Sequence, residues 1–261
     1  MKVLCCNMRG YGRRDGDNAW IYRKDLCLDV IRSEGPDIIC FQELAQFADV
    51  TAAFPEYESY AMIDEPCGDR PMNAIFYRRD RYTRVSAGGY WLSETPHVPG
   101  SKSWDTGSTR LANWIRLEEK GTGREFRVVN THLDHVSQLA RENQAALIVA
   151  DTRAYPDEYP QILTGDMNCD ATNKAIGVLK AGGWVDTYGA IHGTENPGHT
   201  YHGFHGPAYP TAVGGAGVGK IDWIFTRGGI RAVDAEIIRR SVGGKFPSDH
   251  YFVSATLSLG T

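Results

Sequence analysis

The chain has 261 residues, of which 42% are hydrophobic and 23% are charged, and its formal net charge at pH 7 is −4. These values are ordinary for a soluble globular protein and favour one large domain spanning residues 1–261. A slightly acidic chain has no global positive field to attract nucleic acid, so the composition argues against a tight, nonspecific DNA binder.

Signals for export, membrane insertion and disulfide bonding are weak in this sequence. The six cysteines form no CxxC pair, and the chain begins with an apolar strand pattern instead of a signal-peptide core. No apolar run approaches the roughly 18–20 residues that span a bilayer. We therefore expect a cytoplasmic protein with reduced thiols and no membrane partner.

The first half of the chain alternates strand patterns with helix patterns. Apolar runs predict strands over 2–7 and 37–42, and helix-like spacing follows each of them, over 19–33 and 44–54. Aromatic and β-branched residues then predict further strands, a long loop and a hairpin. These segments are the strands 57–63, 73–78 and 82–92, the loop 93–107, and the hairpin strands 111–117 and 125–131.

The second half repeats the same theme and adds a glycine-rich loop. The expected segments are a helix over 137–155, a strand over 161–165, a helix over 172–181, a loop over 198–219, and strands over 220–226, 231–239 and 250–259. Strands outnumber helices, which does not fit a doubly wound parallel sheet. Two mixed sheets packed face to face, with helices outside, fit better.

Oxygen-bearing side chains follow several of the apolar runs. Asn7 ends the first strand, Glu43 follows the second, and Asp249 precedes the last. Mg²⁺ takes oxygen ligands and typically uses one or two carboxylates. The three residues would therefore suit a Mg²⁺ or Mn²⁺ site, and the alternative is that Asn7 and Glu43 cap a turn or helix.

A second group suits phosphate chemistry. Asp166 and Asn168 alternate along an extended segment, so their side chains would project to the same side. One of them could orient or deprotonate a water while the other donates its amide to a phosphate oxygen. The alternative is an Asx-turn that leads into the next helix.

Two histidines lie at strand ends. Asp222 lies inside an apolar run and needs a partner, because an unpaired buried carboxylate is costly. His250 could be that partner, which would fix its tautomer and raise the pKa of the ring, and the alternative is a structural ion pair. His132 is the second strand-end imidazole, and the guanidinium of Arg110 could bind phosphate oxygens.

Three histidines recur at every third position of the glycine-rich loop, at His199, His202 and His205. This spacing suggests zinc, but structural zinc sites usually need four nitrogen or sulfur ligands, so a loop that contacts substrate is favoured. The glycines of this loop form neither G-x-G-x-x-G nor a Walker motif, so a nucleotide cofactor is not indicated.

Taken in chain order, these motifs make the sequence resemble the endonuclease/exonuclease/phosphatase superfamily, which has the deoxyribonuclease I-like fold. The matching stretches are Cys6–Arg9, Ile39–Glu43, Asn130–Asp134, Thr164–Asn168, Lys220–Phe225 and Ser248–His250. The stretches Trp91–Trp104 and Thr200–Phe204, with Arg110, are similar to a mostly bacterial branch that resembles nocturnin-like deadenylases in places.

The resemblance implies a four-layered α/β sandwich, with two packed mixed β-sheets flanked by helices. It also implies hydrolysis of a phosphoester with one or two Mg²⁺ or Mn²⁺ ions. Carried over by motif, Asn7, Glu43 and Asp249 would contact the metal directly or through water.

The resemblance also implies roles for the phosphate group. Asp166 would position or activate the attacking water, Asn168 and His132 would bind the scissile phosphate, and His250, oriented by Asp222, would stabilise the developing charge. The expected substrate-binding residues are Asn7, Arg110, His132, Asn168 and His202.

The expected function is hydrolysis of a phosphodiester or phosphomonoester of a small or single-stranded substrate. A nuclease acting on DNA or RNA is the first alternative; it would need a basic, aromatic-lined groove, for which the first loop offers Arg9, Tyr11, Arg13 and Arg14. A scaffold without catalysis is the second, although every metal and phosphate position is present. A lipid phosphodiesterase ranks lower, because no apolar hairpin indicates membrane docking.

Overall fold

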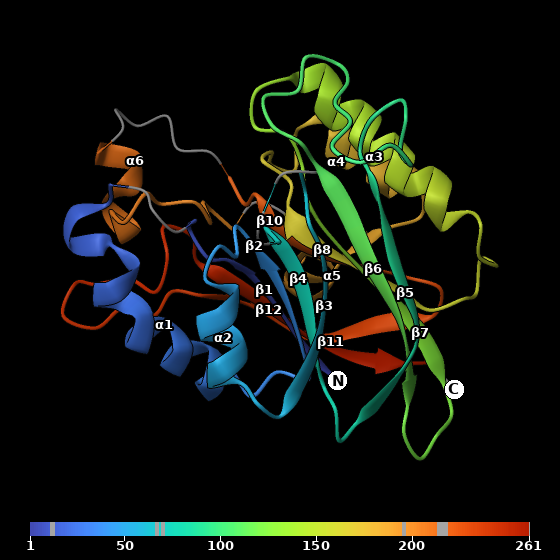
Figure 1. The fold of residues 1–261 in the computed structure, drawn as a ribbon, viewed down its shortest axis with the longest axis horizontal. Coiled ribbons are helices and arrows are strands. Elements are labelled where there is room, and N and C mark those ends of the chain that lie inside the picture. The colour runs from blue at the N-terminus through green and yellow to red at the C-terminus, as the bar shows by residue number, and fades with distance from the viewer. Residues whose placement is uncertain (11–13, 66–67, 69–70, 195–196, 213–218, 261) are drawn as a thin grey trace.

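Two six-stranded mixed sheets form the centre of the molecule, and helices lie on their outer sides (Figure 1). The computed structural model describes residues 1–10, 14–65, 68, 71–194, 197–212 and 219–260. The first sheet has the strand order β11 (Ile230–Ile238), β12 (Phe252–Leu259), β1 (Lys2–Asn7), β2 (Ile38–Gln42), β4 (Asn73–Arg78) and β3 (Tyr57–Met62). The second has the order β5 (Tyr82–Trp91), β6 (Leu111–Glu119), β7 (Glu125–His132), β8 (Gln161–Asp166), β10 (Asp222–Arg227) and β9 (Val185–Asp186).

The longer helices cover the two sheets from outside. On the first sheet lie α1 (Trp20–Glu34) and α2 (Phe47–Ala53), and on the second lie α3 (Gln138–Thr152) and α4 (Lys174–Ala181). Short helices occur in the connections: η1 (Gly16–Asn18), α5 (Thr187–His192), η2 (Gly206–Ala208) and α6 (Tyr209–Ala212). Within the described residues, no helix is long and apolar enough to cross a bilayer. The expected four-layered α/β sandwich is confirmed.

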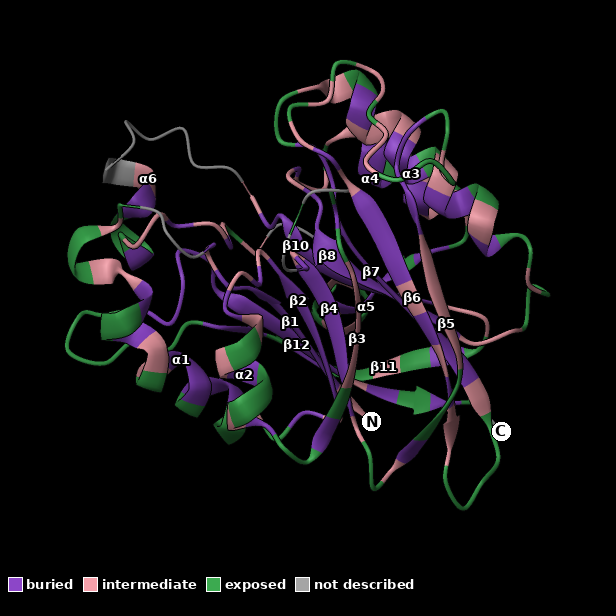
Figure 2. Cartoon of the chain, in the orientation of Figure 1, coloured by how far each residue is buried: buried purple, intermediate pink, exposed green. Residues whose placement is uncertain are grey.

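Three apolar layers separate these four structural layers. Val3 and Cys5 of β1 point into the layer between the sheets, whereas Leu4 and Cys6 pack toward the helices. Successive strand residues face opposite sides of a sheet, so a strand that is covered on both faces must be apolar throughout. This explains why the first strand is an uninterrupted apolar run, and Figure 2 shows the central strands buried while the outer helix faces are exposed.

The predicted strands and the hairpin are confirmed, with small shifts at their ends. The helix expected from residue 172 begins at Lys174, because the side chain of Asn173 caps it by accepting a hydrogen bond from the amide of Ala175. The last strand begins at Phe252, so Asp249 and His250 lie in the loop before it. The two-residue strand β9 and the helix α5 were not predicted.

Two pairs of parallel strands bring their carboxyl ends to the same edge of the molecule. β1 runs parallel to β2, and β7 runs parallel to β8, with His132 opposite Asp166. One step earlier, a Cβ on Gly165 would lie 2.3 Å from the carbonyl oxygen of Thr131. Only glycine permits this close approach, which places Asp166 directly beside His132.

Candidate active site

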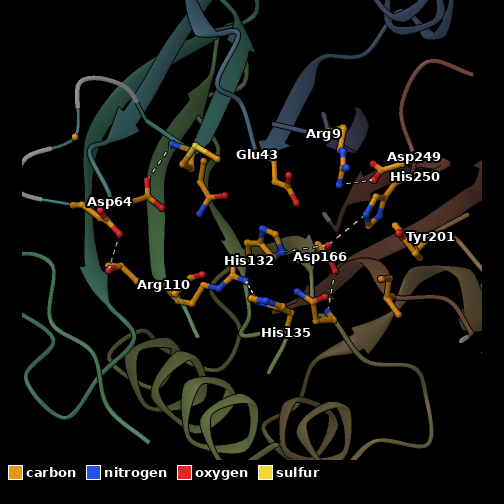
Figure 3. Close-up of a pocket in the computed structure, with 18 of the residues that line it drawn as sticks. Arg9, Glu43, Asp64, Arg110, His132, His135, Asp166, Tyr201, Asp249 and His250 are labelled. Carbon is orange, nitrogen blue, oxygen red and sulfur yellow. Dashed lines mark hydrogen bonds and ion pairs between the residues drawn. The ribbon is translucent and has the colours of Figure 1, made fainter. Parts of the chain in front are cut away.

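A cavity of about 780 Å³ opens at the edge where these strands end (Figure 3). Most of the site residues expected from the sequence line it, and they come from both sheets and the adjoining loops. The lining includes Glu43, Arg110, His132, Asp166, Asn168, Asp249 and His250. Asn7 and Asp222 are buried and contact lining residues from behind.

Asp166 is the centre of the hydrogen-bond network. Its Oδ2 lies 3.0 Å from Nδ2 of Asn7 and 3.3 Å from Nε2 of His132, and its Oδ1 accepts a hydrogen bond from the amide of Asn168 at 2.8 Å. Burial by itself would raise the pKa of Asp166, but His132, His250 and the amide of Asn168 hold that pKa well below its ordinary value. The carboxyl group is therefore an ionised hydrogen-bond acceptor that faces the cavity.

His250 forms a buried pair with Asp222. Its Nδ1 lies 2.9 Å from Oδ2 of Asp222, and its Nε2 lies 3.8 Å from Oδ2 of Asp166. Burial disfavours the charged form of the ring. The nearby carboxylates of Asp222, Asp166 and Asp249 outweigh this effect of burial and raise the pKa of His250 to about 10. This raised pKa favours a cationic ring at neutral pH, and the structure brings together Asp222 and His250, which the sequence analysis paired.

A second group of oxygen donors lies beside this pair. Asn7 Nδ2 is 3.4 Å from Oε1 of Glu43, and Nη1 of Arg9 is 3.3 Å from Oδ2 of Asp249. Burial raises the pKa of Asp249 even though His250 and Arg9 oppose this rise, so its negative charge is incompletely compensated. Carboxylates in such a setting suit a hard divalent cation such as Mg²⁺ or Mn²⁺.

The backbone is unusual at the same place. Arg9, Glu43 and Asn168 have φ angles of 57°, 52° and 50°, and all three line the cavity. In the described part of the chain, these are three of six non-glycine residues with positive φ. A left-handed conformation costs a non-glycine residue on the order of 1–3 kcal/mol, and residues in such conformations cluster at functional sites. This distribution supports a functional site at the cavity.

Asp166, Asp222 and His250 form another group with potential ligand atoms, which all lie within 4.8 Å of one another. Nδ1 of His250 is already bonded to Asp222, and Asp166 already accepts bonds from Asn7 and the amide of Asn168. Hydrogen bonds therefore already occupy several of these ligand atoms, whereas Oδ1 of Asp222 has no hydrogen-bond partner among the described residues. The carboxylates of Glu43 and Asp249 are the better candidates for a Mg²⁺ site.

Arg110 and Asn168 bring nitrogen donors to the cavity. The guanidinium of Arg110 lines the cavity with Nη2 3.1 Å from Nδ1 of His135, and its buried Nε has no hydrogen-bond partner in the described part of the chain. Asn168 donates from Nδ2 to the carbonyl oxygen of Leu133 at 2.9 Å, which fixes the orientation of its amide. Both side chains are held firmly and offer donors to a ligand.

Two predicted substrate contacts do not reach the cavity. His202 is fully buried against Phe246 and Tyr251, with ring centroids 4.7 and 4.2 Å away, and burial lowers the pKa of this histidine to about 3. It is a core residue, which corrects the expectation that it binds substrate. Asn7 is also buried and lies behind Asp166 and Glu43, so it supports these residues instead of contacting phosphate.

Of the four first-loop residues considered for nucleic-acid binding, the structure describes Arg9 and Arg14. Arg9 lines the cavity and pairs with Asp15, and Arg14 is exposed. Tyr11 and Arg13 lie outside the described residues.

Other lining residues were not predicted from the sequence. They include His135, Tyr201, Asp64 and Asn73. The ring centroid of Tyr201 lies 5.1 Å from that of His250. His135 follows the predicted strand end at His132 by three positions, which is a usable signal. Asp64 and Asn73 lie at either end of a connecting loop, and no local pattern distinguishes them.

Comparison with known proteins agrees with this geometry. A model of the Endonuclease/Exonuclease/phosphatase family matches residues 4–250. Nocturnin from Drosophila melanogaster is 31% identical over 166 residues, which are 58% of this chain, and the match covers only about a quarter (24%) of that protein.

Two solved structures extend the likeness to almost the whole chain. The mannosyl-6-phosphatase of Bacteroides thetaiotaomicron is 28% identical and superposes with a TM-score of 0.87 over 99% of both chains. The human nocturnin catalytic domain with bound sulfate is 20% identical and shares the fold, with a TM-score of 0.74 over 99% of this chain and 94% of that one. The chain belongs to the endonuclease/exonuclease/phosphatase family.

Proposed function

We propose that this protein is a divalent-metal-dependent phosphoesterase. The observation that carries the proposal is the arrangement around Asp166, an ionised carboxylate held between His132, Asn7 and the cationic ring of His250 at the wall of a cavity. Membership of a family that includes phosphatases and nucleases supports it.

Glu43 and Asp249 would hold the metal, and Asn7 would support Glu43 from behind. When bound, Mg²⁺ or Mn²⁺ would neutralise charge on the phosphate and make water more acidic. Asp166 would accept a hydrogen bond from the attacking water and aim it at phosphorus. Its lowered pKa makes it a weak base, so orienting the water is the greater part of its role.

The phosphate oxygens would be bound by donors from the second sheet and its loops. His132, Asn168 and Arg110 offer donors to them, and His250 would stabilise the charge that develops during bond cleavage. Removal of one such donor typically costs about 10²–10³-fold in turnover, or about 2.7–4 kcal/mol. Positioning and charge stabilisation would thus supply most of the rate enhancement.

For the substrate, we favour a phosphomonoester of a small molecule. One relative that aligns over 99% of both chains is named a mannosyl-6-phosphatase, and the cavity of about 780 Å³ suits a small ligand. Cleavage of single-stranded nucleic acid is the second candidate, because the chain is 31% identical to a nocturnin over 166 residues. The net charge of −4 weighs against it.

The direct test uses p-nitrophenyl phosphate and bis-p-nitrophenyl phosphate as a matched monoester and diester, with Mg²⁺, Mn²⁺ or EDTA. We expect release from the monoester that requires metal and stops with EDTA. Release from the diester alone would favour the nuclease candidate. No release from either ester or from an oligonucleotide, with metal binding intact, would favour a non-catalytic scaffold.

A further inference from the structure

The cavity extends well beyond the residues assigned to the metal and phosphate. Figure 3 shows Asp64 on the far side of His132 and Arg110 from Asp249 and His250. Asp64 and Glu65 follow β3, and Asn73 begins β4, the strand paired with β3. All three line the cavity, and we call this set the acceptor wall.

The acceptor wall contains a buried oxygen that lacks a partner. Asn73 is only 2% exposed, and its Oδ1 has no hydrogen-bond partner among the residues that the structure describes. An unsatisfied buried acceptor is rare in native proteins and calls for a donor. Because Asn73 lines the cavity, that donor can come from a ligand.

The two acids beside Asn73 are also hydrogen-bond acceptors. Asp64 is 9% exposed; its Oδ1 accepts a bond from the amide of Met72 at 3.1 Å, and burial raises its pKa to about 6. This rise means that the surroundings stabilise the carboxylate poorly. Glu65 is exposed and accepts a longer bond, 3.4 Å, from the hydroxyl of Thr109.

The chemistry of the acceptor wall selects among ligands. Two carboxylates and an amide oxygen attract hydroxyl donors and repel a polyanion such as a nucleic acid. The tyrosines that line the cavity, Tyr201 and Tyr209, contact each other at its other end, beside His250, so they offer no stacking surface for a base at Asp64. Among the described residues, the group of converging metal-type ligands lies elsewhere and includes neither Asp64 nor Glu65.

We propose that the acceptor wall binds the hydroxyl groups of a polyhydroxylated leaving group, so that the preferred substrates are phosphate monoesters of sugars or similar polyols. This inference rests on the proposed phosphoesterase function. Phosphate would lie beside Arg110 and His132, while the hydroxyls of the same molecule donate to Asp64 and Asn73. A site built to bond a hydroxyl discriminates strongly against analogues that lack it.

The test compares kcat/KM for a hexose 6-phosphate with that for n-hexyl phosphate, which has six carbons and no hydroxyl. We expect the metal-loaded protein to prefer the sugar ester about tenfold or more. Asp64→Asn and Asn73→Ala should each reduce this ratio about tenfold, whereas Glu158→Gln, an exposed and remote acid, should leave the ratio unchanged.

Each outcome separates the two proposals. Equal use of both esters by the unmodified protein, or an unchanged ratio in both variants after their folding is verified by circular dichroism, would overturn the inference and keep the phosphoesterase. Faster cleavage of a single-stranded oligonucleotide than of the sugar ester would also overturn the inference about sugar esters and keep the phosphoesterase. If the metal-loaded protein hydrolyses no ester at all, both proposals fail.

Discussion

The two sheets bring different chemistry to one cavity. The ends of the first sheet carry the oxygen donors Glu43 and Asp249, which suit a hard cation. The ends of the second carry His132 and Asp166, which suit a phosphate and a water. Neither sheet holds a complete site, so catalysis would depend on how the two sheets are held against each other.

A buried polar network joins the sheets just below the cavity. Nε2 of Gln42 donates to Oδ1 of Asn130 at 2.6 Å, and Nδ2 of Asn130 donates to the carbonyl oxygens of Phe41 at 2.8 Å and Ala74 at 3.2 Å. The hydroxyl of Thr164 also donates to Oδ1 of Asn130, at 3.2 Å. A fully satisfied buried network specifies one arrangement. These bonds therefore set the register between the two halves of the site.

The largest effect should come from the second sheet. Asp166→Ala removes the group that would orient the attacking water, so kcat should fall by about 10²–10⁴-fold. Steady-state hydrolysis of p-nitrophenyl phosphate at saturating Mg²⁺ measures this fall in kcat. Turnover equal to that of the unmodified protein would remove Asp166 from the mechanism.

The pair that crosses between the sheets comes next. His250→Gln should lower kcat by about 10²–10³-fold, because the cationic donor is lost. Asp222 acts through His250, so the double variant His250→Gln/Asp222→Asn should be no slower than the His250→Gln single variant. Additive losses in this cycle would show that Asp222 has a separate role.

A smaller effect is expected from the network below the site. Asn130→Ala leaves Gln42 and the carbonyl groups of Phe41 and Ala74 without this partner, which should cost about 1–3 kcal/mol per unsatisfied group in urea unfolding. Asn113→Ala is a matched control, since Asn113 is opposite Asn130 on β6 and makes one 3.5 Å bond. An equal loss of stability in the two variants would contradict the special role of Asn130.

The smallest effect on activity should come from His202. The pKa of His202 is about 3 in the folded state and about 6.5 in the unfolded chain. Between these two pH values the histidine binds a proton only when the chain is unfolded. The free energy of unfolding therefore decreases as the pH falls below about 6.5. The loss is at most about 2 kcal/mol at pH 5. His202→Leu should therefore narrow the stability difference between pH 7.5 and pH 5 while keeping kcat/KM within about twofold. A large rise in KM would restore His202 as a substrate contact.

Local patterns were sufficient to predict every strand of the described structure except β9, with small shifts at the strand ends. Asp222 could be assigned a partner because a carboxylate inside an apolar run must be satisfied. The parallel pairs β1–β2 and β7–β8 place these strand ends at one edge, and the packing of the two sheets then brings Asn7 of the first sheet against Asp166 of the second.

Tertiary contacts account for what the sequence did not predict. His202 lies in a glycine-rich stretch that resembles a surface loop, and its burial depends on Phe246 and Tyr251, more than forty positions away. Asp64 and Asn73 belong to a cavity that is also lined by residues of the second sheet and its loops, such as Arg110 and His132. The strand β9 has two residues, too few to show a period.

Binding of Mn²⁺, measured by isothermal titration calorimetry without substrate, tests the division between the sheets most directly. The predicted result is that Glu43→Gln weakens binding about 10–100-fold. Asp222→Asn, a change confined to the second sheet, should bind Mn²⁺ as the unmodified protein does. The reverse pattern, with Asp222→Asn weakened and Glu43→Gln unchanged, would place the metal on Asp166, Asp222 and His250 and contradict the account.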